Sequence, residues 1–204
     1  MTTTAAEIRK AYPQASSFAD KIVSVANDLD IDPSWLANVI RSESNFSPSI
    51  QNSSTNATGL IQFMPKTARG LGTSVEALKN MSANQQMNWV KKYLMPYKGK
   101  MNSQNDVVLA VFYPVALGKP NSFDIADHWA QKIQSGKATY PRGSARYKER
   151  YDYFKRINGG ISKKRDYFKK FEDYWRLTPK AAGIGIIALV ALGGLGYYLW
   201  SRYG

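Results

Sequence analysis

Residues 35–72 read WLANVIRSESNFSPSIQNSSTNATGLIQFMPKTARGLG, and their pattern is the strongest indication of the fold. Leu36, Val39, Ile40 and Glu43 follow one another at three- and four-residue spacing, which places them on one face of a helix. Glu43 is the only acidic residue between positions 33 and 75. Burial raises the pKa of a carboxyl group, so that a buried glutamate stays protonated near neutrality and can donate a proton. The spacing alone leaves two positions open for Glu43, a buried one and an exposed helix end.

The rest of residues 1–140 also reads as helices joined by short turns, because apolar residues recur at helical spacing. Four helix starts are marked by capping signals: Asp32 before Pro33, and the pairs Ser17–Asp20, Ser82–Gln85 and Ser103–Asp106. No alternating strand pattern of useful length occurs, although residues 46–59 are loop-like and could hold a small hairpin. The sequence therefore predicts a mainly α domain over residues 1–140.

The composition excludes several kinds of chemistry. The chain has 204 residues, no cysteine and a single histidine. Disulfides, thiolate nucleophiles and thiolate zinc sites are therefore excluded, as are histidine-rich metal sites built from one chain. His128 is expected to be an ordinary packing or surface residue, and any chemistry must use oxygen and nitrogen.

The positive charge belongs mainly to the carboxy-terminal third. The net charge is +13, yet residues 1–140 hold 14 basic against 10 acidic residues, whereas residues 141–180 hold 13 against 5. Two aromatic helical faces are expected in this basic segment, one with Tyr147, Tyr151 and Phe154, the other with Tyr167, Phe171 and Tyr174. Such helices either lie on an anionic membrane surface or pack against the preceding domain.

Residues 181–200 read AAGIGIIALVALGGLGYYLW and carry no charge. A helix needs roughly 20 such residues to cross about 30 Å of hydrocarbon, so we predict one transmembrane helix here; the alternative is a buried core helix. Basic residues before the span place the large domain on the cytoplasmic side. The first 15 residues lack an apolar run, and no cleavable signal is expected.

Residues 35–72 resemble the lytic transglycosylase family, whose domain is similar to that of goose-type lysozyme. Glu43-Ser44, with Phe46 and Pro48, is similar to the family's glutamate-serine motif. Residues 59–65, GLIQFMP, look like its glycine-leucine-x-glutamine motif. The resemblance covers roughly residues 17–135 and implies a lysozyme-like fold there. It says nothing about the basic segment 141–180 or the span 181–200.

A third family motif, alanine-tyrosine-asparagine, would fall on residues 109–113, LAVFY. The sequence departs from the family here, because Pro114 and Val115 follow where the family often has Asn-Ala-Gly. Either Phe112 or Tyr113 could therefore take the place of the family tyrosine.

The resemblance also implies roles for residues. Glu43 would be the catalytic acid, Ser44 and Gln62 would hold substrate near it, and Tyr113 would hydrogen-bond the glutamate. Phe63 and Phe46 could flank sugar faces, with core packing as the alternative. Most glycosidases use two carboxylates, whereas this family uses one glutamate twice and needs no metal or organic cofactor.

The expected function is cleavage of peptidoglycan between N-acetylmuramic acid and N-acetylglucosamine with a 1,6-anhydro product. The alternatives are a hydrolytic lysozyme on the same fold and an inactive structural membrane or virion protein that binds glycan. The expected partners are peptidoglycan, the lipid bilayer through 181–200 and anionic lipid through 141–180, without nucleic acid. A wall-degrading domain on the cytoplasmic side would meet no substrate, which suggests a phage whose virion contains a membrane: the protein would insert in the host inner membrane, be packaged with it and open the wall at entry.

Overall fold

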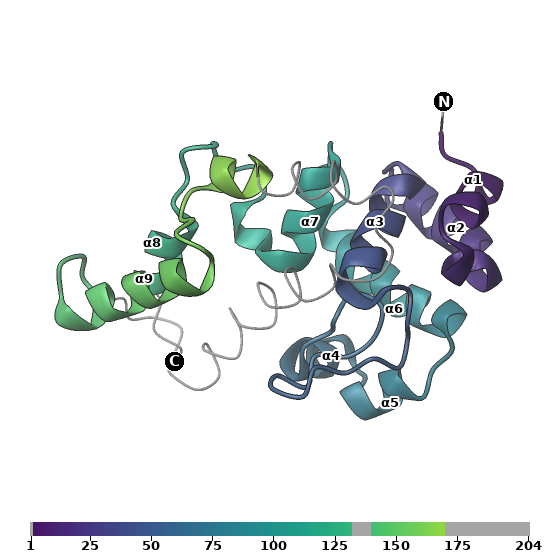
Figure 1. The fold of residues 1–204 in the computed structure, drawn as a ribbon, viewed down its shortest axis with the longest axis horizontal. Helices are drawn as coiled ribbons and strands as arrows, with labels where there is room; N and C mark the ends of the chain where they lie inside the picture. The colour runs from purple at the N-terminus through teal and green to yellow at the C-terminus, as the bar shows by residue number, and fades with distance from the viewer. Residues whose placement is uncertain (1, 132–139, 170–204) are drawn as a thin grey trace.

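The computed structural model of the chain describes residues 2–131 and 140–169, and this part is helical (Figure 1). The α-helices are α1 (Ala5–Ala11), α2 (Ala19–Asp28), α3 (Pro33–Ser44), α4 (Pro65–Leu71), α5 (Val75–Lys79), α6 (Ala83–Leu94), α7 (Gln104–Phe112), α8 (Ile125–Gln131) and α9 (Ala145–Ile157). Three short 3₁₀ helices accompany them: η1 (Pro13–Phe18), η2 (Met95–Tyr97) and η3 (Pro114–Ala116). The predicted mainly α fold is confirmed for these residues.

The loop between α3 and α4 contains the small hairpin that the sequence allowed. Thr58 forms isolated antiparallel bridges with Gln51 on one side and with Phe63 on the other. Within the described residues these bridges do not extend into strands. They hold residues 59–62 in a tight turn at the end of α3.

Three of the four predicted helix starts are confirmed. The Asp32 carboxylate accepts a hydrogen bond from the backbone N–H of Ser34, with Pro33 in the first helical position. Ser82 and Gln85 form a reciprocal capping box at α6, and Ser103 caps α7.

The predicted start at Ser17 is wrong. Ser17 lies inside η1, which runs directly into α2, and no side chain caps α2. Asp20 forms an ion pair with Arg9 of α1 instead. The pair Ser17–Asp20 looked like a cap in sequence only because the preceding 3₁₀ helix was not visible there.

Helix α3 lies at the centre of the fold. It contacts α2 on one side and α7 on the other, and α2 also contacts α6 (Figure 1). Leu36 and Ile40 on its inner face are fully buried. The end of α3, which carries Glu43, is thus surrounded by elements far apart in the sequence.

The described residues beyond position 140 belong to the same hydrophobic core. The Phe154 ring on α9 packs 5.3 Å from the Trp129 ring on α8, and the Tyr167 ring lies 5.2 Å from that of Phe112. Both Phe154 and Tyr167 are buried. The aromatic faces were expected either to lie on a membrane surface or to pack against the preceding domain. Phe154 and Tyr167 pack against the domain.

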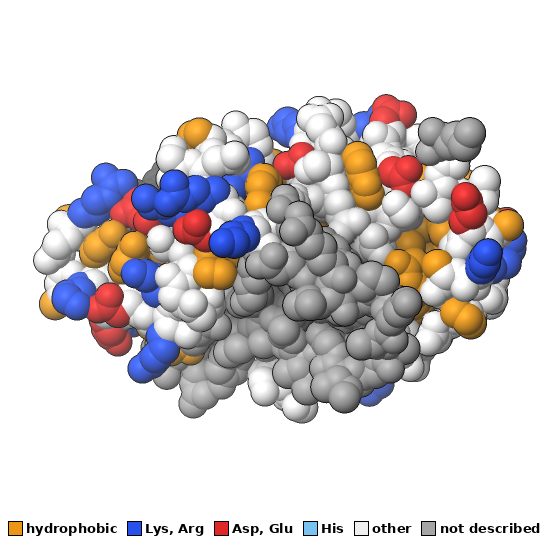
Figure 2. Space-filling view, turned by 45° about the horizontal axis from the view of Figure 1, so that its top comes forward, with side chains coloured by type: hydrophobic (Ala, Val, Ile, Leu, Met, Phe, Trp, Pro, Cys, Tyr) orange, Lys and Arg blue, Asp and Glu red, His pale blue; other side chains and the backbone are white. Residues whose placement is uncertain are grey.

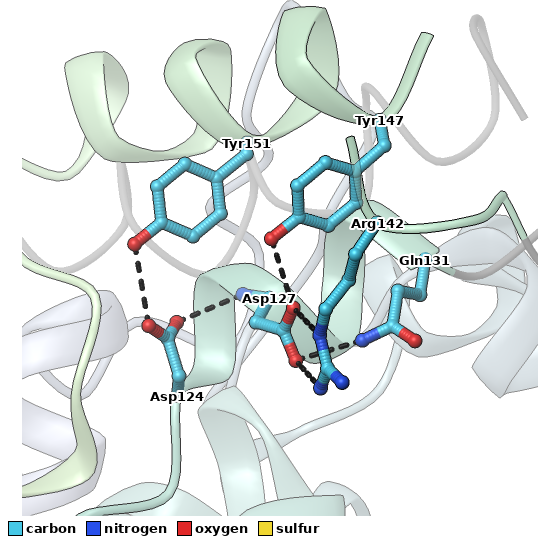
Figure 3. A network of polar contacts seen from close by, with 6 residues as sticks. All are labelled: Asp124, Asp127, Gln131, Arg142, Tyr147 and Tyr151. Atoms are coloured by element: carbon cyan, nitrogen blue, oxygen red, sulfur yellow. Dashed lines mark hydrogen bonds and ion pairs between the residues drawn. The ribbon is translucent and has the colours of Figure 1, made fainter. Parts of the chain in front are cut away.

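A polar network fastens α9 and the residues before it to α8 (Figure 3). Arg142 donates two hydrogen bonds to the Asp127 carboxylate, at 2.8 and 2.6 Å, and the Tyr147 hydroxyl donates a third at 2.8 Å. The Tyr151 hydroxyl donates to Asp124 at 3.2 Å. The Arg142 guanidinium, ahead of the other contacts, holds the pKa of Asp127 below its usual range. Part of the predicted basic surface is therefore used inside the fold.

No helix in residues 2–131 and 140–169 is long and apolar enough to cross a membrane. The predicted transmembrane helix at residues 181–200 lies outside the described residues.

Candidate active site

Glu43 lies in the last turn of α3, where it is almost completely buried, with 5 % of its surface exposed. Of the two positions that the sequence left open, the structure has the buried one. Burial raises the pKa of this carboxyl group to about 8. The carboxyl is therefore mostly protonated at neutral pH, which is the state a general acid needs.

Burial is the cause acting on the pKa of Glu43, and no charged neighbour contributes among the described residues. No other carboxylate of the described residues shifts it. The described chain thus brings one carboxyl group to this place, where most glycosidases need two.

Tyr93 on α6 lies within electrostatic range of Glu43. Its pKa is raised well above the usual range, first by burial, then by Tyr97 and by the Glu43 charge. The Tyr93 hydroxyl donates a hydrogen bond to the carbonyl oxygen of Ala110, 3.0 Å away. A neutral phenol is thus held against the end of α7, within electrostatic range of Glu43.

Tyr113, the predicted partner of the glutamate, has another partner in the structure. Its hydroxyl is hydrogen-bonded to Nδ1 of His128 at 2.7 Å, and the two rings meet edge to face. Pro114 cannot continue the helix, so α7 ends at Phe112 and Tyr113 leaves helical geometry. The tyrosine whose pKa the Glu43 charge raises is Tyr93, which the sequence reasoning missed.

Ser44 is fully buried, and its hydroxyl donates to the backbone. Its Oγ lies 3.0 Å from the carbonyl oxygens of both Ile40 and Leu60. The contact with Leu60 joins the end of α3 to the turn at residues 59–62. The predicted contact of Ser44 with substrate is replaced by a positioning role, because no part of its hydroxyl reaches solvent.

Gln62 stays a candidate for substrate contact. It adopts a left-handed backbone conformation with φ of 52°, and its Nε2 donates to the carbonyl oxygen of Gly59 at 3.1 Å. Together with Tyr93, Thr67 and Val111 it lines a small hollow of about 50 Å³. The strained turn thus presents Gln62 beside Tyr93.

The two phenylalanines considered for sugar contact are core residues. Phe63 is buried and packs edge to face against Tyr93, with ring centroids 6.2 Å apart. Phe46 is buried between Tyr12 and Phe18. Core packing, the alternative given above, therefore holds for both rings.

Gln86 on α6 is a second residue that the sequence reasoning missed. It is fully buried, and its amide group makes three hydrogen bonds to three separate segments. Oε1 accepts from the backbone N–H of Leu60 at 3.0 Å, while Nε2 donates to the carbonyl oxygens of Pro48 and Leu78, both at 2.6 Å. A glutamine among the apolar positions of an amphipathic helix was the sequence signal. Gln86 clamps the turn that carries Leu60 and Gln62.

The described residues contain no group of three or more His, Cys, Asp or Glu side chains placed to hold a metal ion. His128, the one histidine, is held between Tyr113 and Phe123.

Comparison with known protein families gives one finding on this site. Residues 20–110 match the family model described as the transglycosylase SLT domain. No curated protein and no solved structure gives a significant match to the chain. The matched range includes Glu43, Gln62, Gln86 and Tyr93, and it ends before Tyr113.

Proposed function

Because residues 20–110 match the transglycosylase SLT domain, we propose that the chain is a lytic transglycosylase that cleaves peptidoglycan between N-acetylmuramic acid and N-acetylglucosamine, with Glu43 as acid and base. The observation that carries the proposal is the buried carboxyl of Glu43, whose pKa of about 8 keeps the proton in place at neutrality. The absence of a second carboxylate beside it, among the described residues, favours the one-carboxyl route.

In the proposed reaction Glu43 acts twice. Its carboxyl group first donates a proton to the glycosidic oxygen, and the bond from this oxygen to C1 of the muramyl ring breaks. The substrate's own acetamido group stabilises the positive charge at C1. The Glu43 carboxylate then takes the proton of the muramyl 6-hydroxyl, whose oxygen bonds to C1. One group serves as acid and then as base, and a 1,6-anhydro ring forms without water.

The product distinguishes this function from its alternatives. Digestion of purified peptidoglycan by the full-length protein in detergent should release muropeptides with 1,6-anhydro ends. Mass spectrometry checks this, because an anhydro end is lighter by one water than the reducing end that a hydrolytic lysozyme leaves. Reducing ends alone would indicate the lysozyme, and no release at all would indicate a glycan-binding structural protein.

We also propose that the protein is a single-pass membrane protein of a phage virion that opens the wall at entry. The uncharged residues 181–200 and the basic segment before them support an anchor with the enzyme on the cytoplasmic side. Figure 2 shows Lys and Arg side chains gathered at the end formed by α8 and α9, with acidic side chains among them. Within the described part of the basic segment, Arg142, Arg146, Lys148 and Arg165 form ion pairs with acidic neighbours. Lipid contact is therefore expected to depend chiefly on the span.

The membrane proposal predicts that the protein stays with the membrane fraction after an alkaline carbonate wash and is released by detergent. It also predicts that the protein is found in purified phage particles. Release by carbonate would contradict the proposed membrane anchor. Presence in host envelopes alone would contradict the proposed location in the virion.

A further inference from the structure

A cavity of about 490 Å³ opens beside the active-site loop, between that loop, α4 and α5. Its size falls within the range of pockets that bind small molecules, roughly 300 to 1,000 Å³. The polar side chains that matter for its chemistry are Gln51, Asn56, Arg69, Glu76, Lys79 and Asn80. The proposed reaction uses none of them.

The cavity carries charges of both signs with an excess of positive charge. Within the described residues, neither Arg69 nor Lys79 forms an ion pair, so both can attract an anionic group. Glu76 stays ionised, because hydrogen bonds from its own backbone and from Ser74, followed by the Arg69 charge, lower its pKa. The amides of Asn56 and Asn80 add donors and acceptors for peptide groups. The walls fit a small ligand with several carboxylates, an amine and amide bonds.

The residues that line the cavity do not fit the sugar rings of a glycan strand or a nucleic acid. The described lining of the cavity contains no aromatic ring on which the face of a sugar could pack. Glu76 would repel a polyanion such as nucleic acid. Neutral sugars would leave both cations without a partner.

The cavity is connected to the active-site turn through hydrogen bonds. Lys79 Nζ donates to Gln51 Oε1 at 3.4 Å, and Gln51 Nε2 donates to the Thr58 hydroxyl at 3.0 Å. Thr58 in turn pairs with Phe63 across the turn that presents Gln62. Helix α4 and its N-cap residue Met64 lie between the cavity and the small hollow beside Tyr93. Met64 and Thr67 line the hollow. Pro65 and Arg69 line the cavity. A ligand in the cavity would lie one helix away from the candidate site.

We propose that this cavity binds the peptide that peptidoglycan carries on its muramyl residues, with the peptide carboxylates at Arg69 and Lys79 and an amine facing Glu76. The proposal rests on the proposed function, since that function brings a muramyl residue and its peptide to this loop. The cavity would make the enzyme prefer strands that still carry their peptides.

The test compares two substrates with full-length protein in detergent: peptidoglycan strands with their peptides, and strands stripped of peptides by an amidase. The double variant Arg69→Gln/Lys79→Gln should lower kcat/KM on peptide-bearing strands by about tenfold, as expected for two exposed charge contacts, and leave stripped strands within about twofold. Lys10→Gln/Lys100→Gln is the matched control, because it removes two exposed charges away from the cavity. An unchanged preference in the Arg69/Lys79 variant would overturn the proposal.

Failure of the proposed function would look different, because the parent would then cleave neither substrate. Calorimetric titration with the free tripeptide L-Ala-γ-D-Glu-meso-diaminopimelate gives a readout that needs no cleavage. Binding by the parent and the control, lost in the Arg69/Lys79 variant, supports the cavity. Equal binding by all three proteins, or by none, contradicts it.

Discussion

Replacing Glu43 by Gln is expected to lower kcat on peptidoglycan by a factor of about 10² to 10⁴, the usual contribution of general acid–base catalysis. Glutamine keeps the size of the side chain and its ability to accept a hydrogen bond, but it has no proton to give to the leaving sugar oxygen. The measurement is the rate of anhydro-muropeptide release. Glu149→Gln, an exposed glutamate on α9 paired with Arg146, is the matched control and should retain the parent rate.

The Glu43→Gln protein should fold, and its stability should exceed that of the parent at neutral pH. The Glu43 carboxyl has a pKa of about 8 in the folded protein, against the ordinary 4.5 in the unfolded chain. As the pH rises from 4.5 towards 8, the unfolded chain loses this proton first, so the parent loses stability over that window. At pH 7 the loss amounts to about 3 kcal/mol, and glutamine removes it. Denaturant unfolding at pH 4 and pH 7 should show a gain at pH 7 alone.

Two results would contradict this assignment. Near-parental release of anhydro-muropeptides by a folded Glu43→Gln protein would exclude Glu43 as the acid. A stability difference independent of pH would show that the carboxyl is not held protonated in the folded state.

Replacing Gly59 by Ala is expected to lower the free energy of unfolding by about 3 kcal/mol and to reduce activity at least about tenfold. Gly59 has a φ of 80°, where an alanine costs about 1 to 2 kcal/mol. In addition, its Cβ would lie 2.3 Å from Oε1 of Gln86. Since Gln86 is buried and bonded to three segments, it cannot give way without leaving a buried polar group without a partner, which costs about 1 to 3 kcal/mol. The displaced turn would carry Gln62 away from Tyr93.

Gly99→Ala separates the two causes. Gly99 has a similar φ of 77°, but a Cβ there would meet nothing within 4 Å. This variant should lose only the backbone contribution, about 1 to 2 kcal/mol, and keep the parent activity. Chemical denaturation and kcat/KM of both variants are the measurements. If Gly59→Ala were as mild as Gly99→Ala in both, Gln86 would not be clamping the active-site turn.

The features that depend on neighbours along the chain could be predicted from the sequence alone. Helix periodicity placed Glu43 on the apolar face of α3, and the caps at Asp32, Ser82 and Ser103 marked three helix starts. These features are local, because a cap bonds within its own first turn and a helical face repeats every three to four residues. The family motif around Glu43 and Gly59 was readable for the same reason.

The surroundings of Glu43 depend on contacts between parts of the chain that are distant in the sequence. Whether its carboxyl is buried depends on which distant helices cover the end of α3, and the pKa of about 8 follows from that burial. Tyr93 and Gln86 come from α6, some 40 to 50 residues further along the chain, and no spacing rule connects them with Glu43. The Tyr113 hydroxyl, which the resemblance assigned to the glutamate, is hydrogen-bonded to His128 in the structure, after Pro114 ends α7. Side chains that meet across helices are selected by packing of the whole core, which residue spacing along one helix does not contain.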